Sequence, residues 1–232
     1  MYDVSVTDGS VLPGGSTESG VDLVHEDPYF VVVDKPAGLL SVPGRGTDKQ
    51  DCLARRLAQH YADAQVVHRL DMGTSGLWLA ARGAAMQRAL SIAFAERRVD
   101  KRYQAVVSGL VAEPGSADGW GLIDLPLAAD WPNRPRQLID QDRGKPSQTR
   151  WRVLSRDPVA GTSRLELAPL TGRSHQIRVH LQARGHPILG DALYAPPEVQ
   201  ARSPRLLLHA SGLAFAHPVT GEAVKLVSAP AF

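Results

Sequence analysis

The apolar residues of the chain gather in short runs separated by clusters of Gly, Pro, Asp and Ser. Runs of about four to eight apolar or β-branched residues favour strands, and the turn-forming clusters between them favour loops. Three longer stretches carry their apolar residues over segments of helical length. The pattern therefore predicts strands at 21–24, 30–33, 77–80, 101–107, 122–129, 151–154, 164–168 and 206–209, and helices at 49–61, 84–98 and 173–184.

The connections between these elements also carry local signals. Asp27 and Pro28 predict a turn between the first two strands, Thr171 is expected to cap the third helix, and Gly185 is expected to end it. Many short strands with a few helices among them predict an α+β fold with a mixed, largely antiparallel sheet. Residues 1–20, rich in Gly and Ser, predict a flexible arm ahead of one catalytic domain at 21–232.

Composition places the chain among ordinary soluble proteins. It has 232 residues, of which 43% are hydrophobic and 22% charged, so a full core can form. No apolar run approaches the ~20 residues that span a bilayer, and residues 1–10 lack the basic segment of a signal peptide. Cys52 is the only cysteine, which excludes an intrachain disulfide and a multi-cysteine metal site. A cytoplasmic location is the expectation.

The charge of the chain is weakly positive, at +2, and arginine supplies 21 of its 26 basic residues. Arginine suits bidentate phosphate contacts and stacking on bases, but a GC-rich genome would enrich arginine equally well. Residues 130–152 are more telling, with six basic residues against three acidic ones. Such a stretch is either a solvated loop or a surface that binds single-stranded RNA, and for the basic residues we favour RNA binding. Trp131 and Trp151, which flank the stretch, are instead expected to pack in the core. The basic residues are Arg134, Arg136, Arg143, Lys145, Arg150 and Arg152.

An abrupt change from polar to apolar residues at 67–81 is the most distinctive feature. His68, Arg69 and Asp71 surround Leu70, and a loop of Gly, Thr and Ser then leads into an apolar strand. Asp71 is therefore expected in a loop that enters the core, a common place for a catalytic side chain on a rigid scaffold. Most loop aspartates bond nearby backbone amides instead, and the residues alone favour that structural interpretation.

Two further features allow both a structural and a functional interpretation. The Pro- and Gly-containing segment 35–38 is either a rigid connector or one wall of an active site. Tyr103, in a predicted strand, is most simply a core aromatic residue with a satisfied hydroxyl. His175 and His180 are five residues apart and no acidic residue accompanies them, so we assign neither to a metal.

Four stretches together resemble, in the expected order, the RluA-type pseudouridine synthase family. The motif His-Arg-Leu-Asp, two residues, then Thr-Ser-Gly-Leu is long and chemically mixed, so a chance match is far less expected than for a glycine pattern. The resemblance extends from about Val21 to the C terminus. The four stretches are 35–39, 68–77, 101–103 and 171–180.

The resemblance implies a fold in which two halves of a sheet meet around a catalytic cleft. It implies that Asp71 is the catalytic carboxylate and that Arg178 pairs with it. It also implies that Tyr103 stacks on the target base, and that Arg69 fills the space that the base leaves. For RNA binding we add the basic residues Arg134, Arg136, Arg150 and Arg173.

The chemistry of that family suits the residues present. Pseudouridine forms when the glycosidic bond of a uridine breaks, the uracil rotates, and the base rejoins through carbon. No co-reactant is required, so no cofactor is expected, in keeping with a chain that lacks nucleotide-binding and metal motifs. The uridine must flip out of its RNA, and a carboxylate then acts as nucleophile or base. A nearby arginine favours the ionised carboxylate.

Two other functions fit parts of the pattern. A hydrolase with an Asp nucleophile would need a second catalytic carboxylate or metal-binding acids, and no such cluster accompanies Asp71. A catalytically silent RNA-binding module would not need Asp71, Tyr103 and Arg178, yet all three are present. Within the family, residues 125–135 and the lack of room for an N-terminal RNA-binding domain most resemble the branch that modifies a 23S rRNA hairpin loop and tRNA anticodon loops. RNA is thus the expected partner. The protein is expected to be a monomer that binds neither a membrane nor a metal.

Overall fold

The computed structural model describes residues 21–232, so the arm expected at residues 1–20 lies outside the described residues. Strands provide most of the regular structure, and helices are few and short. The strands are β1 (Asp22–Glu26), β2 (Phe30–Lys35), β3 (Ala64–Val66), β4 (Ser75–Arg82), β5 (Asp100–Ser108), β6 (Gly121–Asp124), β7 (Leu127–Ala129), β8 (Gln137–Ile139), β9 (Gln148–Asp157), β10 (Thr162–Pro169), β11 (Leu208–Ala216) and β12 (Ala223–Val227). The helices are η1 (Thr47–Lys49), α1 (Leu53–Ala58), α2 (Gly83–Ala95), α3 (Gln176–Ala183) and α4 (Pro197–Gln200).

Ten of these strands form one sheet, in which eight follow the order β1-β2-β4-β11-β5-β10-β9-β6. β3 pairs with β4 and β12 with β11, while β7 and β8 form a separate two-stranded ribbon. Within the described residues, β4 and β11 are the one parallel pair of named strands, and the other pairs are antiparallel. The predicted α+β class with a mixed, largely antiparallel sheet is confirmed.

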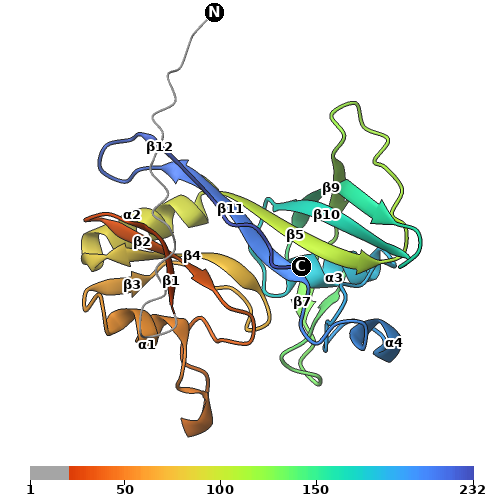
Figure 1. Cartoon of the computed structure of the whole chain (residues 1–232), viewed down its shortest axis with the longest axis horizontal. Coiled ribbons are helices and arrows are strands. Elements are labelled where there is room, and N and C mark those ends of the chain that lie inside the picture. The colour runs from red at the N-terminus through yellow and green to blue at the C-terminus, as the bar shows by residue number, and fades with distance from the viewer. Residues whose placement is uncertain (1–20) are drawn as a thin grey trace, which may run out of the picture.

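The sheet divides into two halves joined by long strands (Figure 1). One half contains β1 to β4 with α1 and α2, and the other contains β6, β9 and β10 with α3. β5 and β11 run diagonally between them, and their mutual pairing ties the halves together. Elements far apart in sequence therefore meet where the halves join.

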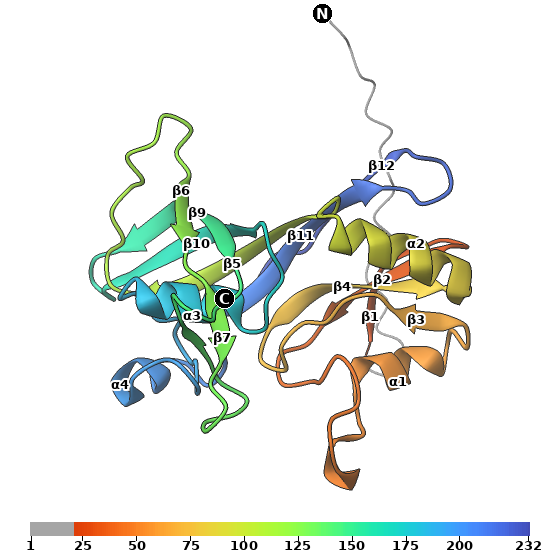
Figure 2. The ribbon, with the colours of Figure 1, turned by 180° about the vertical axis from the view of Figure 1, so that it is seen from behind.

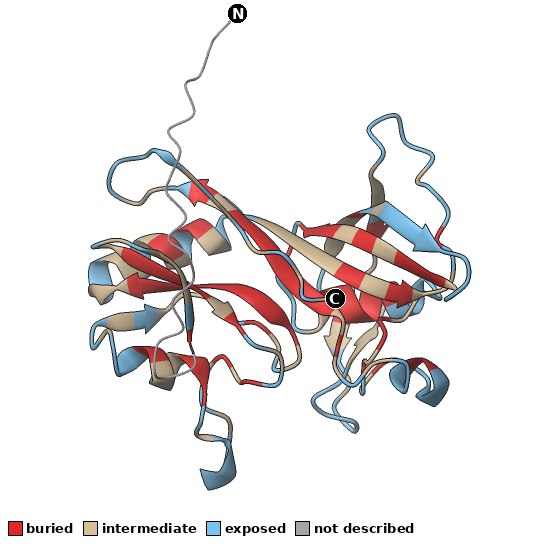
Figure 3. Cartoon of the chain, in the orientation of Figure 1, coloured by how far each residue is buried: buried red, intermediate tan, exposed pale blue. Residues whose placement is uncertain are grey.

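The first half has a core on both faces of its sheet. β2 and β4 are buried almost throughout, which explains their continuous apolar runs. Leu53 and Leu57 of α1 pack with Trp78 on one face, whereas Leu90 of α2 packs with Leu79 on the other. The two helices consequently cover opposite faces (Figure 2), and the buried residues run through the strands between them (Figure 3).

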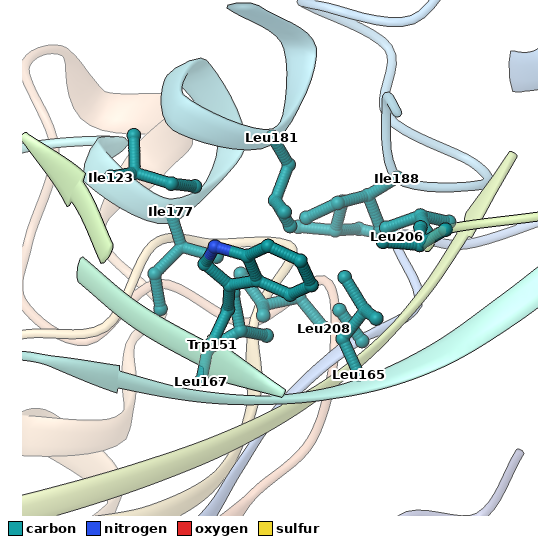
Figure 4. Packing of buried hydrophobic residues seen from close by; sticks show 12 residues of the cluster. Ile123, Trp151, Leu165, Leu167, Ile177, Leu181, Ile188, Leu206 and Leu208 are labelled. Carbon is teal, nitrogen blue, oxygen red and sulfur yellow. The ribbon is translucent and has the colours of Figure 1, made fainter. Parts of the chain in front are cut away.

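The second half is covered on one face by α3. Ile177 and Leu181, one turn apart on this helix, pack over Leu165 of β10 and Trp151 of β9 (Figure 4). Trp151 is buried, as expected from the sequence. Because side chains alternate across a strand, the neighbours of these residues point to the opposite face of the sheet. That alternation turns Arg150 of β9 away from the face that α3 covers.

The first predicted helix, at 49–61, is wrong in its extent. α1 begins only at Leu53, because Cys52 is extended and bridges to Leu40. The second helix also ends early, at Ala95, and Arg97 follows in a left-handed conformation. Contacts with neighbouring segments thus set the helix limits.

The third predicted helix starts late, and its expected cap is wrong. α3 begins at Gln176, because His175 has a left-handed backbone, with φ 56°. The hydroxyl of Thr171 donates instead to the side-chain oxygen of Gln176 and accepts the backbone N–H of Gln148. It links α3 to β9 rather than capping a helix.

The predicted strand at 122–129 is two strands, β6 and β7. Pro126 lies between them, and proline has no amide hydrogen for a strand ladder. The short elements β3, β8 and α4 carry too few residues for a periodic pattern and were not predicted. Among residues 21–232, no helix combines the length and apolar content needed to cross a bilayer.

Candidate active site

Asp71 lies in the loop between β3 and β4, and buried polar contacts hold that loop on both sides. The hydroxyl of Ser41 donates to the carbonyl of Leu70 at 2.8 Å and accepts the backbone N–H of Leu70 at 3.0 Å. Lys35 Nζ donates to the carbonyl of Met72 at 3.1 Å. The residues directly before and after Asp71 are therefore fixed to the segment that follows β2.

Lys35 is fully buried and makes the 35–39 segment a rigid connector behind the Asp71 loop, because the residues that line the cleft begin only at Leu40. Its ammonium donates to the carbonyls of Pro36 at 2.9 Å and Leu39 at 2.7 Å, besides that of Met72. Burial lowers the pKa of Lys35 to about 8, and the charge of Asp71 opposes this shift. A structural ammonium thus clamps two loops together next to the carboxylate.

His68 of the motif has a structural role. Its Nε2 accepts the backbone N–H of Leu79 at 2.9 Å, and its ring stacks on Phe94 at 4.6 Å between centroids. Burial, followed by the charge of Lys101, lowers the pKa of His68 to about 3, so the ring is neutral. The motif histidine consequently anchors the Asp71 loop to β4 and α2.

Two glycines permit the close approaches behind the site. Gly76, at φ 107°, lies opposite Ala210 where β4 and β11 run parallel, and a Cβ there would lie 2.3 Å from the Ala210 carbonyl oxygen. Gly190, at φ 73°, precedes Asp191, and a Cβ would lie 1.8 Å from the Arg205 carbonyl oxygen. Only glycine fits at either position.

Arg178 of α3 bridges two carboxylates. Its Nη1 donates to Asp71 Oδ2 at 3.2 Å, so the pairing expected across 107 positions of sequence is present. Its Nε and Nη2 donate to both oxygens of Asp191, at 2.8 and 2.7 Å. Burial alone would lower the pKa of Arg178, but the hydrogen bonds and charges of Asp191 and then Asp71 raise it. The guanidinium is held charged and oriented at the floor of the cleft.

Asp191 was missed by the sequence analysis. Its side chain is only 1% exposed, and besides Arg178 it accepts the backbone N–H groups of Leu193 and Tyr194. Such a buried carboxylate requires this full set of donors. The available signal was the pair Gly190–Asp191 in a mostly apolar segment, which is unusual for a solvated loop.

Tyr103 lies on β5 where the two halves meet, and its side chain lines the same cleft as Asp71. Its ring packs against the buried clusters of both halves. Burial, followed by the charge of Asp71, raises the pKa of Tyr103, so the phenol stays protonated. Its position allows a base in the cleft to contact the ring.

The cleft itself has a volume of about 910 Å³ and is lined by both halves of the sheet. This is ample room for one nucleotide. Within the described residues, no hydrogen bond or ion pair engages the side chains of Arg69 or Arg173 on its rim. Burial and then Arg97 lower the pKa of Lys101. The basic residues that line the cleft are Arg69, Arg97, Lys101, Arg134, Arg173 and Arg178.

Two of the arginines expected in RNA binding do not line the cleft. Arg150 alternates on β9 with the buried Thr149 and Trp151, so it points to the opposite sheet face, where it pairs with Asp118 at 2.5 Å. Arg136 donates to the carbonyl of Leu193 outside the cleft. Strand alternation, which a charge count ignores, is the physical reason for Arg150. Arg136 lies just before β8 and is turned away by its bond to Leu193.

The expectation that Trp131 packs in the core is wrong. Its ring is 69% exposed, and the guanidinium of Arg134 lies over it. The loop between β7 and β8 is an extension beyond the main sheet, so no core is available to receive the side chain.

Comparison with known proteins agrees with this geometry. The family model for RNA pseudouridylate synthase matches residues 29–183, which is more than half of the chain. The chain therefore belongs to the RNA pseudouridylate synthase family, and it is an isomerase that converts uridine in RNA to pseudouridine.

Similarity to individual proteins places the chain in the RluA-type branch. It is 49% identical, over 93% of its length and 96% of the relative's, to the dual-specificity RNA pseudouridine synthase RluA of Pasteurella multocida. The protein of the same name from Escherichia coli K12 is 48% identical over 87% of the chain and 90% of the relative. Human RNA pseudouridylate synthase domain containing 1 has a similar structure, with a TM-score of 0.75 and 30% identity over 95% of this chain and 87% of that one.

Proposed function

We propose that the chain modifies uridines in two kinds of RNA, a hairpin loop of 23S rRNA and the anticodon loop of tRNA. The proposal is supported by identity of 48–49% to enzymes named for dual specificity, over most of both chains. A cleft of about 910 Å³ with a basic rim suits a single-stranded loop that presents one flipped base.

The observation that carries the catalytic part of the proposal is the ion pair of Asp71 and Arg178 at the floor of that cleft. Asp71 acts on the ribose as nucleophile or base, and its side chain keeps 26% exposure toward the cleft. Arg178 stabilises the negative charge of the carboxylate. The ring of Tyr103 stacks on the flipped uracil within the same cleft.

The arginines on the rim hold the RNA. Arg134 and Arg173 contact phosphates, and Arg69, on the motif loop beside Asp71, enters the stack where the uridine has left. Arg69 and Arg173 are exposed, so both side chains are accessible to an incoming RNA.

Pseudouridine mapping tests the proposal. RNA from cells with and without the gene is compared, and purified protein is then added to RNA from the deletion strain. We expect one 23S rRNA site and one set of tRNA anticodon-loop sites to disappear with the gene and to return with the wild-type protein. Asp71→Asn should restore neither, with a rate loss of at least ~10²-fold. Loss in only one RNA class would reject dual specificity, and full restoration by Asp71→Asn would reject the role of Asp71.

A further inference from the structure

His175 lies beside Asp71 and has no role in the contacts described so far. Three residues before Arg178, it reaches the same carboxylate from the start of α3. Its Nε2 is 3.9 Å from Asp71 Oδ1, whereas Arg178 holds Oδ2. His175 has a left-handed backbone, with φ 56°, and its ring packs edge-on against the ring of Tyr194.

Tyr194 determines which nitrogen of His175 carries the proton. The hydroxyl oxygen of Tyr194 accepts the backbone N–H of Gln137 at 2.8 Å and lies 2.6 Å from His175 Nδ1. Among the contacts of Tyr194 in residues 21–232, no other acceptor is available for the hydroxyl proton. The hydroxyl therefore donates to Nδ1, and the proton of a neutral ring must lie on Nε2.

The ring of His175 is neutral in this setting. Burial lowers its pKa; the charges of Asp71 and Asp191 oppose this shift, while that of Arg178 adds to it. At 3.9 Å, the distance from Nε2 to Asp71 is too long for a hydrogen bond. The cleft thus contains an oriented N–H donor that has no acceptor among residues 21–232, next to the carboxylate of Asp71.

We propose that the Nε2–H of His175 donates a hydrogen bond to the 2′-hydroxyl oxygen of the target uridine. This inference rests on the proposed role of Asp71. As a nucleophile Asp71 contacts C1′, and as a base it contacts the hydrogen on C2′, so in both cases its Oδ1 lies next to the C1′–C2′ bond. The 2′-oxygen is attached to that bond, and a donor 3.9 Å from Oδ1 is well placed to reach it. The contact also distinguishes RNA from DNA at the target position.

A substrate–enzyme double-mutant cycle tests the contact. The substrate is a synthetic stem–loop carrying the uridine whose modification disappears from cells without the gene, whichever RNA class contains it. Single-turnover rates are measured with uridine or 2′-deoxyuridine at that position, for wild type and for His175→Ala. We expect the 2′-deoxy substitution to cost wild type roughly 10-fold more rate than it costs His175→Ala.

Two further variants separate the contact from general damage to the site. His186→Ala removes a histidine that bonds the Ser108 carbonyl outside the cleft, and it should keep the full wild-type sensitivity to the 2′-hydroxyl. Tyr194→Phe keeps the ring but removes the proton donor to Nδ1, so its sensitivity should fall toward that of His175→Ala. Equal losses on the deoxy substrate for wild type and His175→Ala would overturn the proposal, even if His175→Ala is slow on the normal substrate.

Discussion

Replacing Asp191 with Asn should destabilise the protein far more than replacing Asp71 with Asn. Asp191 is 1% exposed and accepts four hydrogen bonds, two of them from Arg178. In Asp191→Asn the side-chain amide would place a donor against one of the guanidinium donors and would leave the buried charge of Arg178 without its main partner. Asp71 is 26% exposed and accepts one bond from Arg178, at 3.2 Å.

The magnitude follows from burial. Breaking a buried ion pair by neutralising one partner costs about 3–5 kcal/mol, a large part of a typical stability of about 5–15 kcal/mol. For a chain of this size that corresponds to a decrease in melting temperature of roughly 6–20 °C. The partly exposed contact of Asp71 should contribute less than about 1 kcal/mol, so Asp71→Asn should melt close to wild type while losing activity.

Urea unfolding followed by tryptophan fluorescence checks this difference. Comparison of the midpoint and slope for wild type, Asp191→Asn and Asp71→Asn separates a change in stability from a change in the unfolded state. If Asp191→Asn unfolds at the wild-type midpoint with an unchanged slope, the buried pair does not stabilise the fold, and the view that Asp191 orients Arg178 fails with it.

Four further outcomes are expected. Tyr103→Phe should keep RNA affinity, because the ring supplies stacking, and should form product more slowly in single-turnover assays; an unchanged rate would leave the ring as its whole contribution. Arg173→Ala should lower the slope of log affinity against log salt concentration by roughly 1. Arg150→Ala, whose side chain lies outside the cleft, should leave that slope unchanged. Arg69→Ala should slow base flipping, measured with a fluorescent base analogue, more than it weakens RNA binding. The pKa of Lys35 is lowered to about 8 from 10.5, so above pH 8 the folded state releases this proton before the unfolded state does. Stability of wild type relative to Lys35→Met should therefore rise by up to ~1.4 kcal/mol per pH unit between pH 8 and 10; a flat difference would contradict the shift.

The pattern of apolar residues was a good guide wherever strands are buried on both faces. β2 and β4 have continuous apolar runs because helices cover both faces of their half of the sheet, and their predicted positions fall within the observed strands. Helix starts were less predictable, since α1 and α3 begin only after Cys52 and His175, whose backbones are extended and left-handed respectively. The spacing of apolar residues along the sequence does not show such backbone conformations.

Some residues of the candidate site were likewise predictable from the sequence, and others were not. Asp71 and Arg178 came from the resemblance to a family and not from periodicity, because they are 107 positions apart. Asp191 and Lys35 were missed as site residues since their importance comes from burial and from the groups they bond, which only the folded chain brings together. Arg150 was misplaced because a charge count along 130–152 does not distinguish the two faces of β9.

The unequal bonds of Arg178 indicate how the site can react without losing its shape. The bonds to Asp191, at 2.7 and 2.8 Å, are buried, whereas the single bond to Asp71 is 3.2 Å long and lies at the open floor of the cleft. In the proposed reaction the carboxylate of Asp71 engages the ribose. The longer and more exposed bond would then be the one that adjusts, because breaking the other two would leave a buried charge unpaired. Arg178 therefore stays with α3 as a fixed positive charge. Stabilisation by a charge already in place requires no reorganisation during the reaction, so the cost of orienting it is met when the protein folds.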